Sequence, residues 1–442
     1  MDIEALARKI IATLQQAGYQ AYLVGGCVRD LLLGSKPKDF DISTNASPQR
    51  LMQLFPNSGH VGAHFGVVIV REGPLHVEVA TFRSDRDYAD GRRPSSVQFE
   101  SDPREDVLRR DFTINGLMME LPGGEVLDYV GGRADLDRRI IRAIGDPEVR
   151  FREDHLRLLR AVRFAARLGF EIEPDTFAAL RRNHALIQKV SAERVRDELV
   201  RILTEGGARR GFELLDQTGL LGDLLPEVAA MKGVEQPPEF HPEGDVWVHT
   251  LLLLEKLNQH PSPTLAWGAL LHDVGKPGTF RVAERIRFDG HVEEGVRLAH
   301  GILQRLRSSR EEIEQVSALV AHHMRFKDVP RMKESTLKRF LRLPKFDEHL
   351  ELHRLDCVAS HGKLDSYEFV HSKLDEFTQE QLKPKPLITG SDLIAAGYTP
   401  GPQFSKMLGA VEDAQLEGRL SDPQQALDFV KQLFPITSSP SP

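Results

Sequence analysis

The stretch that decides the fold of the first part of the chain is Tyr22-Leu23-Val24-Gly25-Gly26-Cys27-Val28-Arg29-Asp30, followed shortly by Asp39-Phe40-Asp41-Ile42. The apolar run Ala21–Val24 predicts a short buried strand, and the segment from Cys27 to Leu33 predicts a helix. The glycine pair between them lets backbone N–H groups approach a phosphate at the positive end of that helix. An ordinary tight strand-to-helix turn has the same sequence, so the pair alone leaves both interpretations open.

Two aspartates on alternate residues come next. On a strand, Asp39 and Asp41 project to one face while the apolar residues beside them point to the core. Two carboxylates so close repel each other unless a cation lies between them, and Mg²⁺ prefers such oxygen ligands. Glu78, in the alternating strand 76–82, offers a third acid for two metal ions that would stabilise an in-line phosphoryl displacement. An exposed strand edge is the alternative interpretation.

Length and composition place the chain among globular proteins. Its 442 residues suggest about three domains, and 40% hydrophobic with 28% charged residues argue against disorder. It lacks both an apolar run of about 18 residues and a signal-like start, so we expect no membrane partner. Two distant cysteines, Cys27 and Cys357, give no disulfide framework and favour the cytoplasm.

The charge is unevenly distributed along the chain. A net charge of -7 argues against indiscriminate coating of nucleic acid, yet one segment is rich in arginine and suits phosphates. A solvated helix face would have the same composition. The arginines of this segment are Arg133, Arg138, Arg139, Arg142, Arg150, Arg152, Arg157, Arg160, Arg163 and Arg167.

Several further segments have recognisable local patterns. Apolar spacing predicts a helix over Ile3–Ala17, and Asp146 followed by Pro147 predicts a helix start. Residues Arg83–Ser96 break the periodicity and predict a long mobile loop. The set Arg109–Gly116 suits triphosphate and ribose contacts, although a structural helix with a paired acid would look similar.

The helix expected after Phe151 carries an acid and a guanidinium side by side. Glu153, Asp154 and Arg157 are three and four residues apart, so one helix face would hold them, and Arg160 and Arg163 would extend it. An acid beside a guanidinium offers an acceptor and a donor, as a Watson–Crick edge does. An ordinary helix salt bridge is the alternative.

Five motifs in order resemble those of the class II tRNA nucleotidyltransferase and bacterial poly(A) polymerase family, over roughly the first 225 residues. The motifs are Leu23–Asp30, Asp39–Asp41, Arg109–Asn115, Glu153–Arg157 and Glu193–Leu199. The resemblance implies an α+β fold in which a mixed-sheet, polymerase beta-like nucleotidyltransferase head is followed by an all-α neck and body. It also implies that Asp39 and Asp41 hold magnesium at the catalytic site, with Glu78 as third acid.

The same resemblance implies a nucleotide site that selects CTP or ATP without a nucleic-acid template and extends the tRNA 3′ end. The residues expected to bind the nucleotide are Gly25, Gly26, Arg29, Arg110, Asp111, Asp154, Arg157, Arg160 and Arg163. Segment 61–68 lacks the basic pair typical of the poly(A) polymerases, and the intact segment 83–96 speaks against an enzyme that adds only CC. Addition of CCA, of A alone, or of a poly(A) tail stays open, as does a hydrolase whose head merely binds nucleotide.

A second set of histidines follows a proline-rich linker. Histidines and aspartates on separate helices can converge on one or two divalent ions, whereas a single such histidine is more often a core residue. From about Gly244 to Leu364 the chain resembles the HD metal-dependent phosphohydrolase domain. The resemblance implies His249, His272, Asp273 and Asp356 as metal ligands, His291 and His322 as candidate ligands of a second metal, and Lys276 as a phosphate contact.

These patterns divide the chain into four expected domains. They are the head (1–143), the helical neck and body that select nucleotide and bind tRNA (144–233), an all-α HD domain (234–375) and a helical tail with a disordered end (376–442). In the HD domain a water with lowered pKa on a divalent metal would attack a phosphoester of an RNA end or nucleotide.

Overall fold

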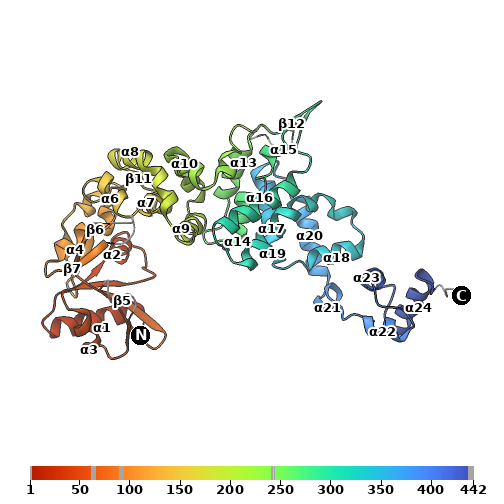
Figure 1. Ribbon diagram of the computed structural model, residues 1–442, viewed down its shortest axis with the longest axis horizontal. Coiled ribbons are helices and arrows are strands. Elements are labelled where there is room, and N and C mark those ends of the chain that lie inside the picture. Colours follow the sequence, from red (N-terminus) through yellow and green to blue (C-terminus); the bar gives the residue numbers. More distant parts are fainter. Residues whose placement is uncertain (1, 61–65, 89–93, 240–241, 243, 437–442) are drawn as a thin grey trace. The chain divides into compact units, whose positions relative to one another are not determined.

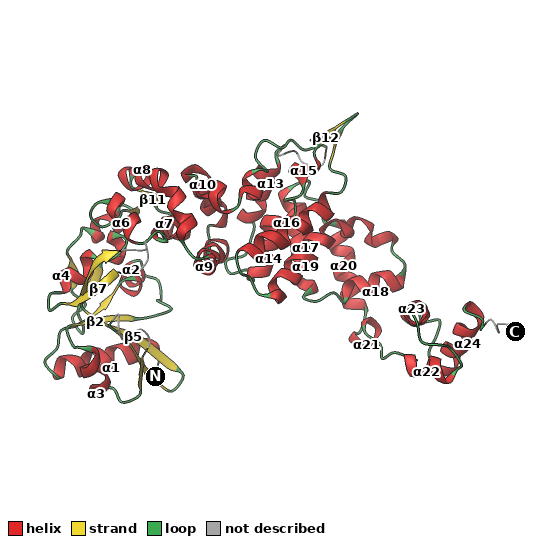
Figure 2. Ribbon diagram, viewed as in Figure 1, coloured by secondary structure: helices red, strands yellow, loops and turns green. Residues whose placement is uncertain are grey.

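The computed structural model describes residues 2–60, 66–88, 94–239, 242 and 244–436 (Figure 1). The chain divides into two compact units. The first runs to Ala230 and includes the short segments Leu257–Pro263 and Ile302–Ser308, and the second contains the remaining residues from Met231 onward. Figure 2 shows that the larger strands belong to the first unit and that helices dominate the second.

A mixed sheet forms the core of the first unit. Its strand order is β3-β4-β5-β2-β1-β8-β9. The strands are β1 (Ala21–Val24), β2 (Asp41–Thr44), β3 (Ser58–His60), β4 (Val67–Glu72), β5 (Leu75–Thr81), β8 (Leu117–Met119) and β9 (Val126–Asp128). Strands β2 and β5 are parallel, and the other neighbours are antiparallel. The predicted mixed-sheet head is confirmed, and β1 has the predicted bounds.

Three helices pack against strands of this sheet. Helix α1 (Ile3–Gln16) begins where the Asp2 carboxylate accepts a hydrogen bond from the Ala5 N–H at 2.9 Å, and it buries one apolar stripe. Helix α2 (Gly26–Leu32) starts directly after Gly25, whose φ of 77° is a left-handed conformation that suits glycine. Both predicted helices are confirmed to within one residue. Helix α3 (Pro48–Leu54) completes this group.

The prediction of one long loop over Arg83–Ser96 is wrong, because both ends of this segment form strands. Strands β6 (Arg83–Tyr88) and β7 (Pro94–Phe99) form an antiparallel pair in which Arg83 lies opposite Phe99. Backbone hydrogen bonds hold the two strands together, and these bonds do not require alternating apolar residues. The segment therefore lacks the periodicity from which a strand is predicted. Residues 89–93 lie outside the described part of the chain.

The head also contains α4 (Pro103–Leu108), η2 (Thr113–Asn115), α5 (Gly132–Asp137) and the strand β10 (Ile140–Ile141), which pairs with β11 (Glu171–Ile172). Apart from the two-residue strand β11, residues 144–233 form helices and connecting turns, and this confirms the predicted helical neck and body. Its helices are α6 (Pro147–Glu153), α7 (Arg157–Leu168), α8 (Pro174–Asn183), η3 (His184–Lys189), α9 (Ala192–Thr204), α10 (Ala208–Thr218), α11 (Leu220–Leu224) and α12 (Pro226–Ala229). Asp146 caps α6 as predicted, because its carboxylate accepts from the Glu148 N–H at 2.9 Å.

The single helix expected across Glu153, Asp154 and Arg157 is interrupted. Asp154 has an extended backbone, with φ −136° and ψ 105°, and α7 begins only at Arg157. The cause is local, since the Asp154 carboxylate accepts a hydrogen bond from the Leu156 N–H at 3.1 Å, a turn that competes with the helix.

The second unit is almost entirely helical. Its helices are α13 (Val246–Glu255), α14 (Pro263–Leu271), α15 (Lys276–Thr279), α16 (His291–Arg305), α17 (Arg310–His322), η4 (His323–Arg331), α18 (Glu334–Leu341), α19 (Phe346–Ala359), α20 (Asp365–Glu376), α21 (Gln379–Leu382), α22 (Gly390–Ala395), α23 (Gln403–Leu416) and α24 (Pro423–Leu433). The strands β12 (Arg281–Val282) and β13 (Ile286–Arg287) form one hairpin. Residues 437–442, expected to be disordered, lie outside the described residues.

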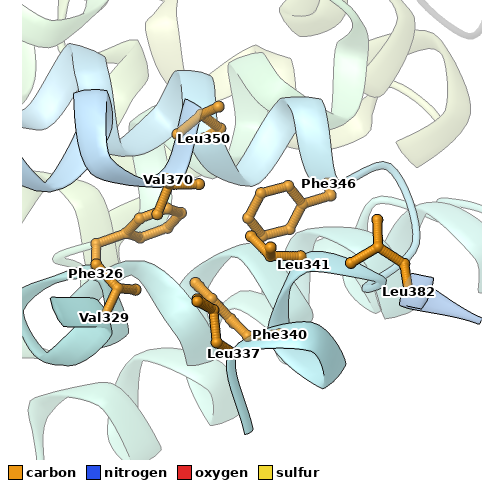
Figure 3. Close-up of a cluster of buried hydrophobic side chains, with 9 residues drawn as sticks. All are labelled: Phe326, Val329, Leu337, Phe340, Leu341, Phe346, Leu350, Val370 and Leu382. Atoms are coloured by element: carbon orange, nitrogen blue, oxygen red, sulfur yellow. The ribbon is translucent and has the colours of Figure 1, made fainter. Parts of the chain in front are cut away.

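An aromatic core fixes η4 against α18 and α19. The Phe340 ring lies edge-on to the rings of Phe326 at 5.0 Å and Phe346 at 5.3 Å, and aliphatic side chains surround them (Figure 3). This packing sets the positions of His323 at the start of η4 and of Asp356 on α19. A separate apolar cluster, which includes Leu393 and Met407, holds the helical tail together.

Both cysteines are buried. Cys27 is 3% exposed and its thiol donates to the Val24 carbonyl at 3.3 Å, and Cys357 is 4% exposed. Burial raises the pKa of Cys27 to about 11, and burial together with the Asp356 charge raises the pKa of Cys357 to about 12. Neither thiol is therefore ionised at neutral pH.

Candidate active sites

The acids of the head lie on neighbouring strands. Asp41 on β2 is in register with Glu78 on the parallel strand β5, so both carboxylates lie on one face of the sheet. Asp39 precedes β2 and is exposed like Asp41, whereas Phe40 between them is buried, as the alternation predicts. The ligand atoms of the three acids do not all lie within 4.8 Å of one another, since the described groups that do so are in the second unit.

The electrostatics of Asp41 suit a bound cation. Its side chain is exposed to solvent at the mouth of a cavity, but the surrounding protein removes much of its hydration. Desolvation and the neighbouring Glu78 raise the pKa of Asp41 to about 6, against the opposing effect of Arg110. A divalent cation would relieve this repulsion, so the donor set fits the Mg²⁺ that the sequence predicts.

One cavity of 430 Å³ in the first unit gathers all the predicted nucleotide-binding residues. It also contains Asp41, so the carboxylate face and the nucleotide residues share one space. The lining residues are Gly25, Gly26, Arg29, Asp41, Arg83, Arg109, Arg110, Asp111, Asn115, Asp154, Arg157, Arg160, Arg163 and Phe164. Arginines dominate this wall, which makes the cavity suitable for a polyphosphate.

Asp111 is committed to other protein groups. Its carboxylate accepts from the Asn115 amide at 3.1 Å and from the Arg160 guanidinium at 2.8 Å, and Asn115 in turn accepts from Arg29 at 2.7 Å. Burial alone would raise the pKa of Asp111, but the Arg160 charge and hydrogen bond win and lower it to about 2. Asp111 therefore orients two arginines toward the cavity.

Phe164 is a residue of this site that the sequence did not suggest. The guanidinium carbons of Arg29, Arg160 and Arg163 lie 5.3, 5.3 and 4.5 Å from the centre of its ring. Each is within the range of a cation–π interaction. The only available signal was the i, i+4 spacing from Arg160 on a helix, which is also common in a purely structural helix.

Replacing Phe164 by leucine is expected to loosen these three arginines. We expect the KM for CTP and for ATP to rise about tenfold, because cation–π contacts contribute about 0.5–2 kcal/mol each. Steady-state nucleotide addition measures it, and Phe164→Tyr, which keeps the ring, should restore the KM. An unchanged KM in the leucine variant would show that the ring has no role in placing the arginines.

Asp106 on α4 is a second residue that the sequence did not suggest. It is fully buried and its carboxylate accepts from Arg109 at 2.6 Å and from Arg110 at 2.9 Å, with the Ser43 hydroxyl donating at 3.2 Å. Although burial opposes ionisation, the two guanidiniums lower the pKa of Asp106 to about 2. This carboxylate fixes both arginines on the cavity wall.

Asp106→Asn is expected to lower the free energy of unfolding at pH 7 by about 3 kcal/mol, because it removes the buried carboxylate that pairs with two partly buried guanidiniums. The folded pKa lies below the ordinary 3.8. The stabilisation is therefore present above pH about 4 and declines as the pH falls toward about 2. Urea unfolding across this range should show the difference from wild type narrowing, with the exposed neighbour Glu105→Gln as control. A difference that is constant with pH would contradict this assignment.

Asp154 and Arg157 each have their own support. The Asp154 carboxylate accepts from Arg194 at 3.2 Å, while Arg157 donates to Glu153 at 2.7 Å and to the Arg109 carbonyl at 2.9 Å. Arg194 lies on α9, within the motif Glu193–Leu199. The Glu198 side chain of that motif pairs with buried Arg163 at 2.7 Å. The motif therefore positions cavity residues from a neighbouring helix.

Two ligand groups converge in the second unit. One contains His249, His272 and Asp356, and the other contains Asp273, His291 and His323, with the ligand atoms of each group within 4.8 Å of one another. The groups adjoin, since the Nε2 atom of His272 lies 3.3 Å from His249 Nε2 and 3.2 Å from an Asp273 oxygen. Imidazole and carboxylate donors in this arrangement suit one or two divalent ions.

The histidine tautomers in this cluster suit metal ligation. The Nδ1 atoms of His272, His291 and His323 lie 3.0, 2.9 and 2.7 Å from backbone carbonyls, which makes Nδ1 the donor and leaves Nε2 with a lone pair. Within the described residues, the buried Nε2 atoms of His291 and His323 have no hydrogen-bond partner. Burial lowers the pKa of His323 to about 4, so this ring is neutral at pH 7. These unpartnered nitrogens fit a metal.

The structure places His323, rather than the predicted His322, beside Asp273 and His291. The His322 ring instead packs near Phe340 at 6.3 Å and His349 at 5.8 Å. Helix α17 ends at His322 and the chain tightens into η4 at His323, so the two adjacent rings point in different directions.

The Lys276 ammonium already has two close partners. It donates to the Asp273 carboxylate and to the Gln236 side chain, both at 2.6 Å, and lies 5.3 Å from the Phe288 ring centre. It also lines a cavity beside the ligand groups. Its predicted phosphate contact stays a prediction, and holding Asp273 is the contact it makes in the structure.

Comparison with known proteins agrees with this arrangement. Family models match residues 21–142 (Poly A polymerase head domain), 169–232 (Probable RNA and SrmB- binding site of polymerase A) and 245–354 (HD domain). A CCA-adding enzyme of Levilactobacillus brevis is 33% identical over 423 residues, which are 96% of each chain. The chain belongs to the CCA-adding enzyme family.

Solved structures of CCA-adding enzymes share its fold. The Bacillus stearothermophilus CCA-adding enzyme in complex with CTP matches with a TM-score of 0.75 and 27% identity, over 98% of both chains. The Thermotoga maritima enzyme complexed with tRNA_CCA matches in fold, with a TM-score of 0.60 and 21% identity over 98% of this chain and 96% of that one. Membership of this family supports CCA addition rather than the alternatives of A-only addition, poly(A) synthesis or hydrolysis alone.

Two of the expectations depend on which residues the structure describes. Residues 61–65, within the segment that distinguishes poly(A) polymerases from tRNA enzymes, lie outside the described residues. In the part of the chain that is described, no helix is both long enough and apolar enough to cross a membrane.

Proposed function

We propose that this protein adds CCA to the tRNA 3′ end from CTP and ATP, without a nucleic-acid template. The observation that carries the proposal is the likeness to a CCA-adding enzyme over 96% of both chains. The cavity in which Asp41 meets all the predicted nucleotide-binding residues supports it. We propose the cytoplasm as the site of this activity, and the two free cysteines support it.

The residues divide the work of nucleotidyl transfer. Asp39 and Asp41, with Glu78, would hold Mg²⁺, which when bound lowers the pKa of a hydroxyl and neutralises charge on a leaving pyrophosphate. Arg29 and Arg110 bind the triphosphate, because both guanidiniums lie in the same cavity as Asp41. The tRNA 3′-hydroxyl attacks the α-phosphorus, the bond to the bridging oxygen breaks, and pyrophosphate leaves.

The base is selected by Asp154 and Arg157. A carboxylate and a guanidinium offer an acceptor and donors to the edge of cytosine or adenine. Arg194 holds Asp154 at the cavity, and Glu153 holds Arg157 there. The two groups therefore keep their positions without a hydrogen bond to each other. The protein side chains thereby replace a template strand.

Arg157→Ala is expected to reduce discrimination between CTP and ATP by a factor of about 100, because a base edge loses its hydrogen-bond partner. The measurement is the ratio of kcat/KM for the two nucleotides on tRNA ending at the discriminator base. Arg152→Ala is the matched control, since Arg152 lies on α6, is 70% exposed and does not line the cavity. Unchanged nucleotide choice in Arg157→Ala would refute its role as a protein template.

One experiment tests the whole proposal. Purified protein with Mg²⁺ is incubated with tRNAs that end at the discriminator base, at C and at CC, each with CTP, ATP or both. We expect growth to CCA and no further. Extension only of the tRNA ending in CC would identify an A-adding enzyme, long tails a poly(A) polymerase, and no extension would overturn nucleotidyl transfer.

We propose a phosphohydrolase activity for the second unit. Two adjoining groups of metal-type ligands with unpartnered buried nitrogens support it. A divalent metal bound there would lower the pKa of a water that attacks a phosphoester of an RNA end or nucleotide. Metal analysis of the dialysed protein, followed by phosphate release from RNA with a 3′-phosphate, tests the activity. A chain that binds no metal and releases no phosphate would overturn it.

The proposed functions divide each of the two units into two domains. The first unit would contain the head (1–143) and the neck and body (144–233), and the second would contain the HD domain (234–375) and the tail (376–442). Limited proteolysis tests these boundaries, because cleavage is expected in the linkers near residues 234 and 376. Cleavage within a core helix such as α7 would contradict them.

A further inference from the structure

A cavity of 640 Å³ opens beside the ligand groups of the HD domain. Asp273, His291 and His323 contribute one part of its wall, and the hairpin segment Arg285–Asp289 with Lys327 contributes another. This volume lies in the range of sites for drug-sized ligands and far exceeds the space that a single phosphate needs. The cavity therefore has room for a substrate that extends beyond the reacting phosphate.

Three cations of this wall are uncommitted. Among the described residues, Arg285, Arg287 and Lys327 have no ion pair, whereas Lys276 is held by Asp273. Arg287 belongs to strand β13 and Arg285 lies in the bend just before it, and both residues line the cavity. Outside the ligand groups, Asp289 is the one acid among the described lining residues. Such an excess of cations favours an anion at a second position.

Along the chain, an aromatic residue of the wall stands between these arginines and the ligand residue His291. Phe288 is half-buried and lines the cavity, and its backbone carbonyl orients His291 at 2.9 Å. The Phe280 ring lies 5.9 Å from it and is 38% exposed. Exposed aromatic rings beside arginines are the surfaces on which single-stranded nucleic acid stacks its bases.

From these contacts we infer that the HD cavity takes an RNA end of at least two nucleotides. The terminal 3′-phosphate lies at the ligand groups, the terminal base stacks on Phe288, and the internal phosphate binds Arg285 and Arg287. This assignment rests on the proposed phosphohydrolase function and names its substrate class. In the reaction a water oxygen bonds to phosphorus, the ester P–O bond breaks, and the released 3′-hydroxyl takes a proton.

Two ligands with the same reacting group differ in whether they carry an internal phosphate. The mononucleotide Up and the dinucleotide ApUp both end in a 3′-phosphate, but only ApUp has an internal phosphate for the arginines. We expect the full chain to release phosphate from ApUp with a kcat/KM about tenfold higher than from Up, the effect of a hydrogen bond to a charged group. Equilibrium binding of both ligands should show the same ratio.

The charge-reversed variant Arg285→Glu with Arg287→Glu is expected to remove the preference for ApUp and to leave Up unchanged. Arg281→Glu is the matched control, because Arg281 belongs to the same hairpin but does not line the cavity. Phosphate release from Up, which depends on the ligand groups of the same unit, serves as the folding control for the double variant and for Arg281→Glu. Phe288→Leu should weaken Up and ApUp alike, because both place a base on the ring.

The outcomes distinguish the two levels of the assignment. Equal handling of Up and ApUp by the wild type, or equal losses for both ligands in the double variant, would overturn the two-nucleotide substrate while leaving the hydrolase intact. Absence of phosphate release and of binding for both ligands would overturn the hydrolase itself. A loss in Arg281→Glu as large as in the double variant would reduce the effect to the general charge of the hairpin.

Discussion

Replacing Asp39 and Asp41 together by alanine is expected to abolish nucleotide addition, by a factor of about 1,000 or more, while phosphate release by the HD domain continues. Metal-assisted charge stabilisation contributes several kcal/mol to such a transfer, and these two carboxylates are the proposed principal ligands of that metal in the head. Single-nucleotide extension of a tRNA ending in CC measures the loss. Glu72→Ala, an exposed acid on the same sheet, is the control and should keep full activity.

Loss of both activities in the double variant would contradict two independent sites and indicate one shared site or general misfolding. Circular dichroism and thermal unfolding separate these two outcomes. Both aspartates are exposed at the edge of β2, so their removal opens no cavity in the core. We therefore expect the variant to stay folded.

His323→Ala is expected to reduce phosphate release by about 100-fold or more and to lower the divalent metal bound per chain. The reason is geometric, since the unpartnered Nε2 of His323 faces Asp273 and its loss removes one ligand of that group. Metal content after dialysis and phosphate release are the two measurements. Nucleotide addition should be unaffected.

The neighbouring variant His322→Ala is the control for this prediction. His322 packs on Phe340 and His349, so its loss is expected to affect stability and leave the metal content of the chain unchanged. If His322→Ala lost metal and activity as His323→Ala does, the assignment of His323 would be wrong. Adjacent residues of the same type make this comparison closely matched.

Much of the fold follows from local patterns. The strand at Ala21–Val24, the helix α1, the Asp146 cap and the alternation around Asp41 depend on short-range spacing, which a sequence displays directly. The β6–β7 pair could not be predicted in this way, because its polar strands are held by backbone hydrogen bonds and show no apolar periodicity. The break at Asp154 depends on one side-chain hydrogen bond that outweighs a helical periodicity.

The candidate sites divide in a similar way. Groups that would meet a ligand, such as Asp41 and Arg157, stand in recognisable motifs. Groups that hold them are harder to recognise, because the contacts of Asp106 with Arg109 and Arg110 have the spacing of any helix ion pair. The contact of Phe164 with Arg29 depends on the fold. The choice between His322 and His323 depends on where α17 ends, and element boundaries are what sequence patterns specify least well.

The two buried thiols make this protein a convenient host for spectroscopic probes. The chain has no other cysteines, and both are below 5% exposed with the pKa of each thiol raised, so they react slowly with maleimides and oxidants. A single cysteine introduced at an exposed site, for instance Val282→Cys, could therefore be labelled selectively in the otherwise native chain. A fluorophore there would report ligand entry into the HD cavity in real time.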